Sequence, residues 1–172
     1  MIDHRFKADS YRANKNWLGH ALGWFALLFA GMLSSCTSGH ERHDSIEGRI
    51  SNLIEVLASS NSERQQQMAL IELERYGISG VPYLVAHLGD YRLLYRQKVS
   101  LANKDPNAVE RVRHYSPETV HDALSAILNQ ITGVHFSFVY NGSNMQERDN
   151  NRRSWLNWCR IKFPDRVTLC GG

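Results

Sequence analysis

QQMALIELERYGISGVPYLVAHLGD, residues 66–90, is the stretch that decides the fold. Apolar residues in its first half recur at helical spacing, which predicts a helix running from Glu63 to Tyr76. Gly77 ends that helix, because a glycine takes the positive φ that follows a helix without steric cost. The segment from Val81 starts the next helix with Pro82 near its first position, where no N–H is needed. The stretch therefore predicts two helices joined by a tight turn.

The same stretch resembles a HEAT-type repeat. The shared features are paired helices, a glycine-bounded turn, and a Val-Pro-x-Leu-x-x-x-Leu segment that is followed by Asp90. The resemblance covers about one repeat, and a single repeat cannot bury its own apolar faces. It therefore implies an all-α stack in which neighbouring helices complete the core.

Three further helices are predicted from their start and stop signals. One runs from Asp44 to Ser59 and begins with a capping box of Asp44 and Glu47. Another starts at Ser116-Pro117-Glu118 and ends at Gly133. The last covers Arg148 to Ile161. The prediction is an all-α, HEAT-like stack of about five helices.

One irregular loop segment, residues 91–115, interrupts this arrangement. Lys98 to Pro106 is polar and is expected to be a loop, and Asn107 to His114 is expected to form one helical turn. A loop of this length in a compact domain is either functional or mobile. The helical domain as a whole is expected to span residues 45–172.

The C-terminal part resembles a second pattern of bacterial HEAT-like proteins. Residues 119–138, TVHDALSAILNQITGVHFSF, are followed by Arg148 and by Trp155 and Trp158. In that pattern a helix ends in Ile-Thr-Gly, a phenylalanine segment follows, and a Trp-bearing helix closes the stack. The resemblance implies an architecture and carries no activity with it.

The N-terminal region carries a targeting signal. A positively charged start precedes ALGWFALLFAGMLSSC at residues 21–36, whose apolar run has signal-peptide length and is short for a membrane span. Its last four residues, Leu33-Ser34-Ser35-Cys36, resemble the lipobox of bacterial lipoproteins. The resemblance implies that residues 1–35 are a signal peptide, that Cys36 is lipidated, and that residues 36–44 are the lipidated cysteine and a polar tether. The alternative is an uncleaved anchor helix from Trp17 to Ser35.

Both alternatives place the residues after Cys36 outside the cytoplasm. Acyl chains on Cys36 would hold the protein durably at a membrane. Thr37 stands where aspartate is the familiar inner-membrane retention residue of lipoproteins. The resemblance therefore favours the outer membrane of a Gram-negative envelope, with the domain facing the periplasm.

Charge and cysteine content narrow the function classes. The chain has 20 basic and 17 acidic residues, and four of the basic and two of the acidic ones lie in residues 1–16. The rest is almost neutral, which argues against a dedicated nucleic-acid binder. With Cys36 lipidated, Cys159 and Cys170 remain as a pair in an oxidising compartment, where a disulfide is the expectation.

A basic and aromatic stripe near the C-terminus is the candidate binding surface. Its members are Arg148, Arg152, Arg153, Trp155, Trp158 and Arg160. An exposed stripe of this kind would meet anionic lipid headgroups, glycan or an acidic partner. The alternative is that both tryptophans close the core and that the arginines form a solvated face.

Catalytic and metal-binding patterns are weak in this sequence. His114 and His121 lie too far apart on one helix to share an ion, and His40 and His43 lie in a tether that fixes no geometry. His87 and Asp90 could form a functional pair, but the better explanation is that His87 faces the dipole at a helix C-terminus. The chain lacks a Gly-x-Ser-x-Gly elbow and a glycine-rich phosphate loop. No catalytic residue, metal, cofactor or small-molecule substrate is predicted.

These observations predict a lipid-anchored, non-enzymatic interaction or scaffold module with an envelope protein as its partner. The rival prediction is an envelope enzyme that acts on peptidoglycan or lipid through residues 91–115. A third, purely structural function would be to stiffen the envelope.

Overall fold

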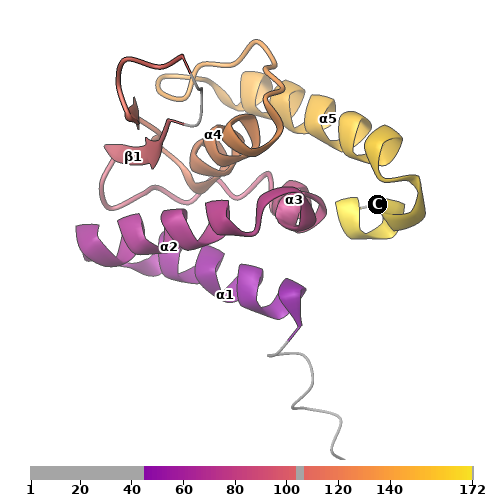
Figure 1. The fold of residues 1–172 in the computed structure, drawn as a ribbon, viewed down its shortest axis with the longest axis horizontal. Helices are drawn as coiled ribbons and strands as arrows, with labels where there is room; N and C mark the ends of the chain where they lie inside the picture. Colours follow the sequence, from indigo (N-terminus) through magenta and orange to yellow (C-terminus); the bar gives the residue numbers. More distant parts are fainter. Residues whose placement is uncertain (1–44, 104–106, 172) are drawn as a thin grey trace, which may run out of the picture. The chain divides into compact units, whose positions relative to one another are not determined.

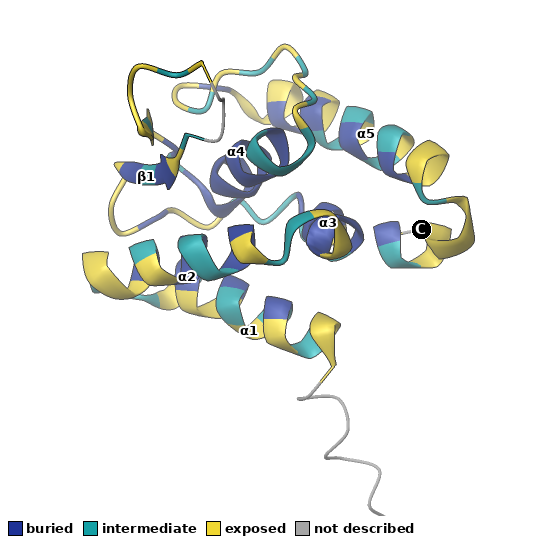
Figure 2. Ribbon diagram, in the orientation of Figure 1, coloured by how far each residue is buried: buried dark blue, intermediate teal, exposed yellow. Residues whose placement is uncertain are grey.

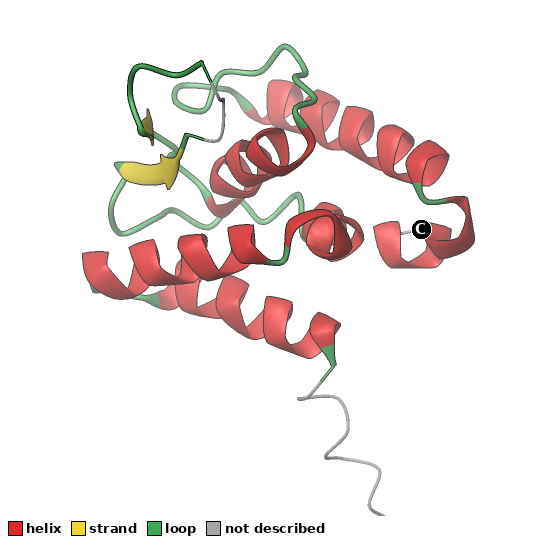
Figure 3. Ribbon diagram, viewed as in Figure 1, coloured by secondary structure: helices red, strands yellow, loops and turns green. Residues whose placement is uncertain are grey.

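The computed structural model describes residues 45–103 and 107–171, which form a mainly helical domain with one small sheet (Figures 1 and 3). The helices in chain order are α1 (Ile46–Ser59), α2 (Glu63–Arg75), α3 (Gly77–Ala86), α4 (Val120–Thr132), α5 (Met145–Lys162) and the short 3₁₀ helix η1 (Pro164–Cys170). The strands β1 (Val99–Ala102) and β2 (Val112–Tyr115) lie between α3 and α4 in the chain. The expected all-α fold is confirmed only as a mainly helical one, since a two-stranded sheet is also present. The expectations for residues 1–44, including Cys36, His40 and His43, lie outside the described residues.

Helix α4 forms the centre of the core. Every residue from Val120 to Asn129 is buried, and the helix is dark blue around its circumference in Figure 2. It contacts α1, α2 and α3, and α1 and α2 lie side by side as a pair. Full burial of side chains such as Leu124, Ile127 and Leu128 contributes about 1.5–3 kcal/mol each. The other helices therefore pack their apolar side chains around this one.

Side-chain caps set where the helices begin. The Ser45 hydroxyl accepts the N–H of Gly48 at 3.0 Å and caps α1. The expected capping box of Asp44 and Glu47 involves Asp44, which lies outside the described residues. Thr119 and Asp122 form a reciprocal capping box at α4, so this helix begins later than the expected start at Ser116.

A second capping box determines the start of α5. Asn144 accepts the N–H of Glu147 at 3.0 Å, and the Glu147 carboxylate accepts the N–H of Asn144 at 2.8 Å. The last helix therefore begins at Met145, ahead of the expected Arg148.

The junction between α2 and α3 is tighter than expected. Gly77 has a φ of 53°, as a helix stop requires, but α3 begins at this same residue. Pro82 therefore lies inside α3, not at its start. Gly80 has to be a glycine, because a Cβ atom there would lie 2.7 Å from the Cβ atom of Tyr76. The two helices thus meet at an abrupt corner.

Residues 99–115 form a hairpin where a loop and a helical turn were expected. The strands pair antiparallel, with Val99 opposite Tyr115 and Ala102 opposite Val112. Val99 and Leu101 are buried, so β1 turns one face to the core. The expectation of a helical turn within residues 107–114 is wrong, because this segment supplies the second strand.

Candidate functional site

The predicted basic and aromatic stripe does not form one surface. Arg148 and Trp155 are buried, Arg152 and Trp158 are partly buried, and Arg153 and Arg160 are exposed. A helix turns about 100° per residue, so a run of residues along α5 reaches both the core and solvent. The expectation of a common binding surface is therefore wrong for Arg148 and Trp155.

Arg148 joins α5 to the first turn of α4. Its Nε donates to Asp122 Oδ1 at 2.9 Å, and its Nη2 donates to Asp122 Oδ2 and to Glu118 Oε2, each at 2.9 Å. Its Nη1 donates to the carbonyl of Ser143. The hydrogen bond to Asp122 is the main reason that the pKa of Arg148 rises above its ordinary value. This arginine is a structural cross-link and is not available to a partner.

The tryptophans close the core in an aromatic cluster. The ring of Trp155 lies edge-on to Phe136 at 4.9 Å between centroids and to Trp158 at 5.6 Å. Trp158 in turn contacts Phe163 at 6.0 Å. Edge-to-face rings of this kind contribute about 0.5–1.5 kcal/mol beyond their buried area. The alternative that both tryptophans serve the core is the one that fits these contacts.

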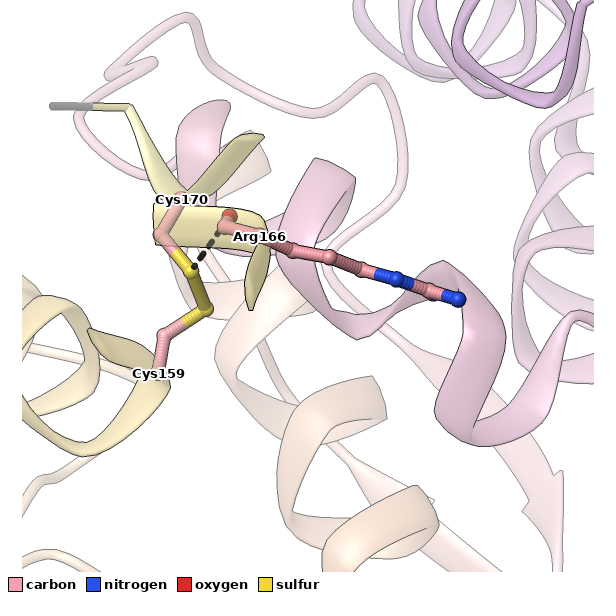
Figure 4. Close-up of a disulfide and its surroundings, with 3 residues drawn as sticks. All are labelled: Cys159, Arg166 and Cys170. Atoms are coloured by element: carbon pink, nitrogen blue, oxygen red, sulfur yellow. Dashed lines mark hydrogen bonds between the residues drawn. A yellow bond between two sulfur atoms is a disulfide. The ribbon is translucent and has the colours of Figure 1, made fainter. Parts of the chain in front are cut away.

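A disulfide between Cys159 and Cys170 holds the C-terminal segment (Figure 4). The two Cα atoms are 6.1 Å apart, and both cysteines are buried. The bond links η1 to the last turns of α5, and Gly171 then lies against Ala86 of α3. The tail is therefore fastened to two helices.

His121 is a buried histidine that faces no solvent. Its Nδ1 accepts the N–H of Gly89 at 3.2 Å, and its ring contacts Tyr91 and Phe138 at 5.7 and 5.5 Å between centroids. No described residue gives its Nε2 a hydrogen bond of ordinary geometry. Burial lowers the pKa of His121 to about 4, because the charged imidazolium is poorly solvated there. His121 is therefore neutral in the folded protein at pH 7.

His87 and Asp90 have separate structural partners. The imidazole of His87 bridges the Tyr83 carbonyl at 2.8 Å and the Ser51 hydroxyl at 3.2 Å, which ties α3 to α1. Asp90 pairs with Arg92 at 2.7 Å. Burial alone would raise the pKa of Asp90, but the hydrogen bonds from Arg92 outweigh it and lower that pKa. Both side chains are engaged in holding the chain together.

A groove of about 770 Å³ runs along the outer side of the α1–α2 pair. Leu53, Val56 and Met68 supply its apolar lining, and the turn at residues 59–62 supplies serine and asparagine side chains. Val56 is 41% exposed and Met68 is 52% exposed. The sequence did not predict this groove, since helical periodicity does not distinguish an apolar core face from an apolar outer face.

The hairpin is attached to α2 by two adjacent glutamines. The amide of Gln66 exchanges hydrogen bonds with the backbone of Arg96 at 2.5 and 3.2 Å, and the amide of Gln67 does the same with Ser100 at 2.6 and 3.1 Å. On the sheet, Ser100 Oγ and His114 Nδ1 are hydrogen-bonded at 2.9 Å. His114 is exposed and His121 is buried, so the two histidines form no common site.

Comparison with protein-family models, with curated proteins and with solved structures gave no match for this chain. None of the helices within residues 45–103 and 107–171 is long and apolar enough to cross a membrane. In the same residues, no three His, Cys, Asp or Glu side chains lie together in a way that could hold a metal ion. Within the described residues, the α1–α2 groove and the hairpin are two surfaces that could serve a function.

Proposed function

We propose that this protein is a lipid-anchored envelope protein that acts as a non-enzymatic interaction module. The lipobox-like sequence ending at Cys36 supports the anchor. Residues 37–44 separate that cysteine from the described domain and span at most about 25–30 Å when extended. A domain on so short a tether stays close to the bilayer, where its partners are other envelope proteins. Thr37 supports the outer membrane as its location.

The observation that carries the interaction function is the apolar groove on the α1–α2 pair. Leu53, Val56 and Met68 leave apolar surface open to solvent on two neighbouring helices. Grooves of this kind bind the apolar face of a partner helix, with anchors spaced by three or four residues. The proposed occupant is therefore an amphipathic helix of an envelope protein.

We also propose that the domain is a short HEAT-like stack. The side-by-side pair of α1 and α2 supports this assignment. A HEAT-like stack has an outermost helix pair that no further repeat covers. The groove lies on such a pair.

In-cell chemical cross-linking, followed by purification and mass spectrometry, tests the proposed function. The expected result is one envelope protein cross-linked in stoichiometric amount. Its yield should fall at least tenfold with Met68→Glu, because binding of the partner would bury the charge of the new glutamate. Val109→Glu is the matched control, since Val109 is 99% exposed outside the groove. No partner above background, or equal loss with both variants, contradicts the proposal.

The alternative function is an envelope enzyme that acts on peptidoglycan or lipid through residues 91–115. The hydrogen bond between Ser100 and His114 favours it, because a serine beside an imidazole can become a nucleophile. It ranks second because the two residues are also direct cross-strand neighbours, for which such a bond is ordinary. A turnover of envelope material that Ser100→Ala abolishes would establish the enzyme in its place.

A further inference from the structure

The hairpin has two edges, and the hydrogen-bond pattern shows which backbone groups point outward. Asn103 N–H donates to the Arg111 carbonyl at 2.8 Å, so these two residues form a hydrogen-bonded pair. Such pairs alternate along an antiparallel ladder, and the residues between them direct N–H and C=O away from the partner strand. The register places Val112 and His114 in this outward position on β2.

The corresponding edge of β1 is covered. Ser100 is outward-facing on β1, and both its N–H and its carbonyl are bonded to the Gln67 amide. The outward carbonyl of Ala102 accepts from Gln130. On β2, by contrast, no described residue bonds to the backbone groups that Val112 and His114 direct outward.

The space beside this open edge is a hollow of about 440 Å³. The residues of β2 line it together with Asn103, Glu110, His135 and Tyr140. The rings of Tyr115 and Tyr140 meet edge-on at 5.5 Å between centroids. Val112 is 40% exposed and His114 is exposed, so the hollow is accessible from solvent. In Figure 3 the strands lie at the end of the domain away from η1.

The charges around the edge favour an acidic ligand. Arg113 in β2 and Arg111, which directly precedes the strand, lie two residues apart and so share one face of the extended segment, and they outnumber the one acidic residue of the hollow, Glu110. Neither makes an ion pair with a residue that the structure describes. A second copy of the chain would bring its own two arginines to this edge, and like charges on paired strands repel. A foreign strand with acidic side chains on that face would be attracted.

We propose that the outer edge of β2 binds an extended acidic peptide segment of another protein, which adds as a third strand. Backbone hydrogen bonds to Val112 and His114 would supply affinity, and Arg111 and Arg113 would select acidic side chains at alternate positions. The edge lies apart from the α1–α2 groove and shares no lining residue with it. The proposal can therefore be tested independently of the groove.

The test uses the full-length chain in detergent and a fluorescein-labelled decapeptide of five Thr-Glu repeats. Binding is followed by fluorescence anisotropy and by amide hydrogen exchange in NMR spectra. We expect the N–H groups of Val112 and His114 to exchange at least tenfold more slowly with the peptide bound. We expect no comparable slowing with five Thr-Lys repeats.

Two variants separate the backbone and charge contributions. Val112→Pro removes an outward N–H but no β1–β2 hydrogen bond, and should weaken binding by about fivefold to tenfold. Arg113→Glu should weaken binding by about threefold to tenfold, whereas Arg153→Glu, on the exposed face of α5, should leave it unchanged. Circular dichroism confirms that each variant is folded.

Several results would overturn the proposal. These are absence of binding to the acidic peptide, equal binding of the basic peptide, or full affinity in Val112→Pro. A dimer in sedimentation that Val112→Pro disperses would show that a second copy is the occupant.

Discussion

Replacing Arg148 by methionine tests how α5 is joined to the first turn of α4. The substitution keeps the length and apolar stem of the side chain and removes its charge. Asp122, which is fully buried, then loses two hydrogen bonds, and Glu118, which is 32% exposed in its side chain, loses one. The Ser143 carbonyl also loses its donor.

The expected cost follows from the burial of the partners. Removing one member of a buried ion pair costs about 3–5 kcal/mol, because the remaining charge is left without compensation. Most of this cost comes from Asp122, since water screens the partly exposed Glu118. For a domain of this size such a loss lowers Tm by about 10–20 °C.

Urea and thermal unfolding monitored by circular dichroism measure this cost. Arg153→Met is the matched control on the same helix, because Arg153 is exposed, and it should change the free energy of unfolding by less than about 0.5 kcal/mol. A double-mutant cycle with Asp122→Asn should give a coupling of about 2–3 kcal/mol. If Arg148→Met is as stable as Arg153→Met, the reasoning about the buried cross-link is refuted.

Three other perturbations have defined outcomes. Cys170→Ser should lower the free energy of unfolding by about 3 kcal/mol, because the disulfide spans 11 residues. Calorimetry of the protein with and without reductant measures this loss. Equal Tm values in the two conditions would contradict the prediction. The pKa of His121 falls to about 4 on folding from an ordinary value near 6.5. As pH falls, His121 therefore takes up a proton in the unfolded chain before it does so in the folded protein, and about 3 kcal/mol of stability should be lost between pH 7 and pH 4. Urea titrations across this pH range should show a smaller loss in His121→Gln. An identical pH dependence in that variant would exclude His121 as the source of the loss. Gln67→Leu should speed amide exchange across Val99–Ala102, because Ser100 loses two hydrogen bonds; unchanged protection in NMR exchange spectra would show that Gln67 does not hold the hairpin.

Local signals predicted much of the helical framework. Ser62 and Gly133 lie where such residues start and stop helices, and α2 and α4 have those limits in the structure. The start of α4 was misplaced because Ser116 and Thr119 both carry capping hydroxyls. Only the carboxylate of Asp122, three residues beyond Thr119, closes a reciprocal box and decides between them.

The hairpin depends on contacts distant in the sequence, which is why it was missed. The four residues of β1 give too short an alternation to distinguish a strand from a loop. Besides its pairing with β2, the strand is held by hydrogen bonds between the Ser100 backbone and the side-chain amide of Gln67, 33 residues earlier. No local propensity reports such a contact.

The absence of long-range information from local sequence patterns also explains why Arg148 was predicted to lie on a binding surface. Arg148 was counted among surface arginines because long charged side chains are usually exposed. The available signal was the pair of carboxylates at Glu118 and Asp122, four residues apart around the start of a largely apolar helix. The helix dipole alone stabilises acids in that position, so the pair did not specify that Arg148 of α5 binds both carboxylates.

The central claim is that a lipid on Cys36 holds this domain at the envelope. Intact-mass spectrometry of the protein extracted from membranes of its native host tests that claim most directly. The account predicts a chain that begins at Cys36, lacks residues 1–35 and carries the added mass of acyl chains on its first residue. A chain that retains residues 1–35, or one with an unmodified Cys36, would contradict the account.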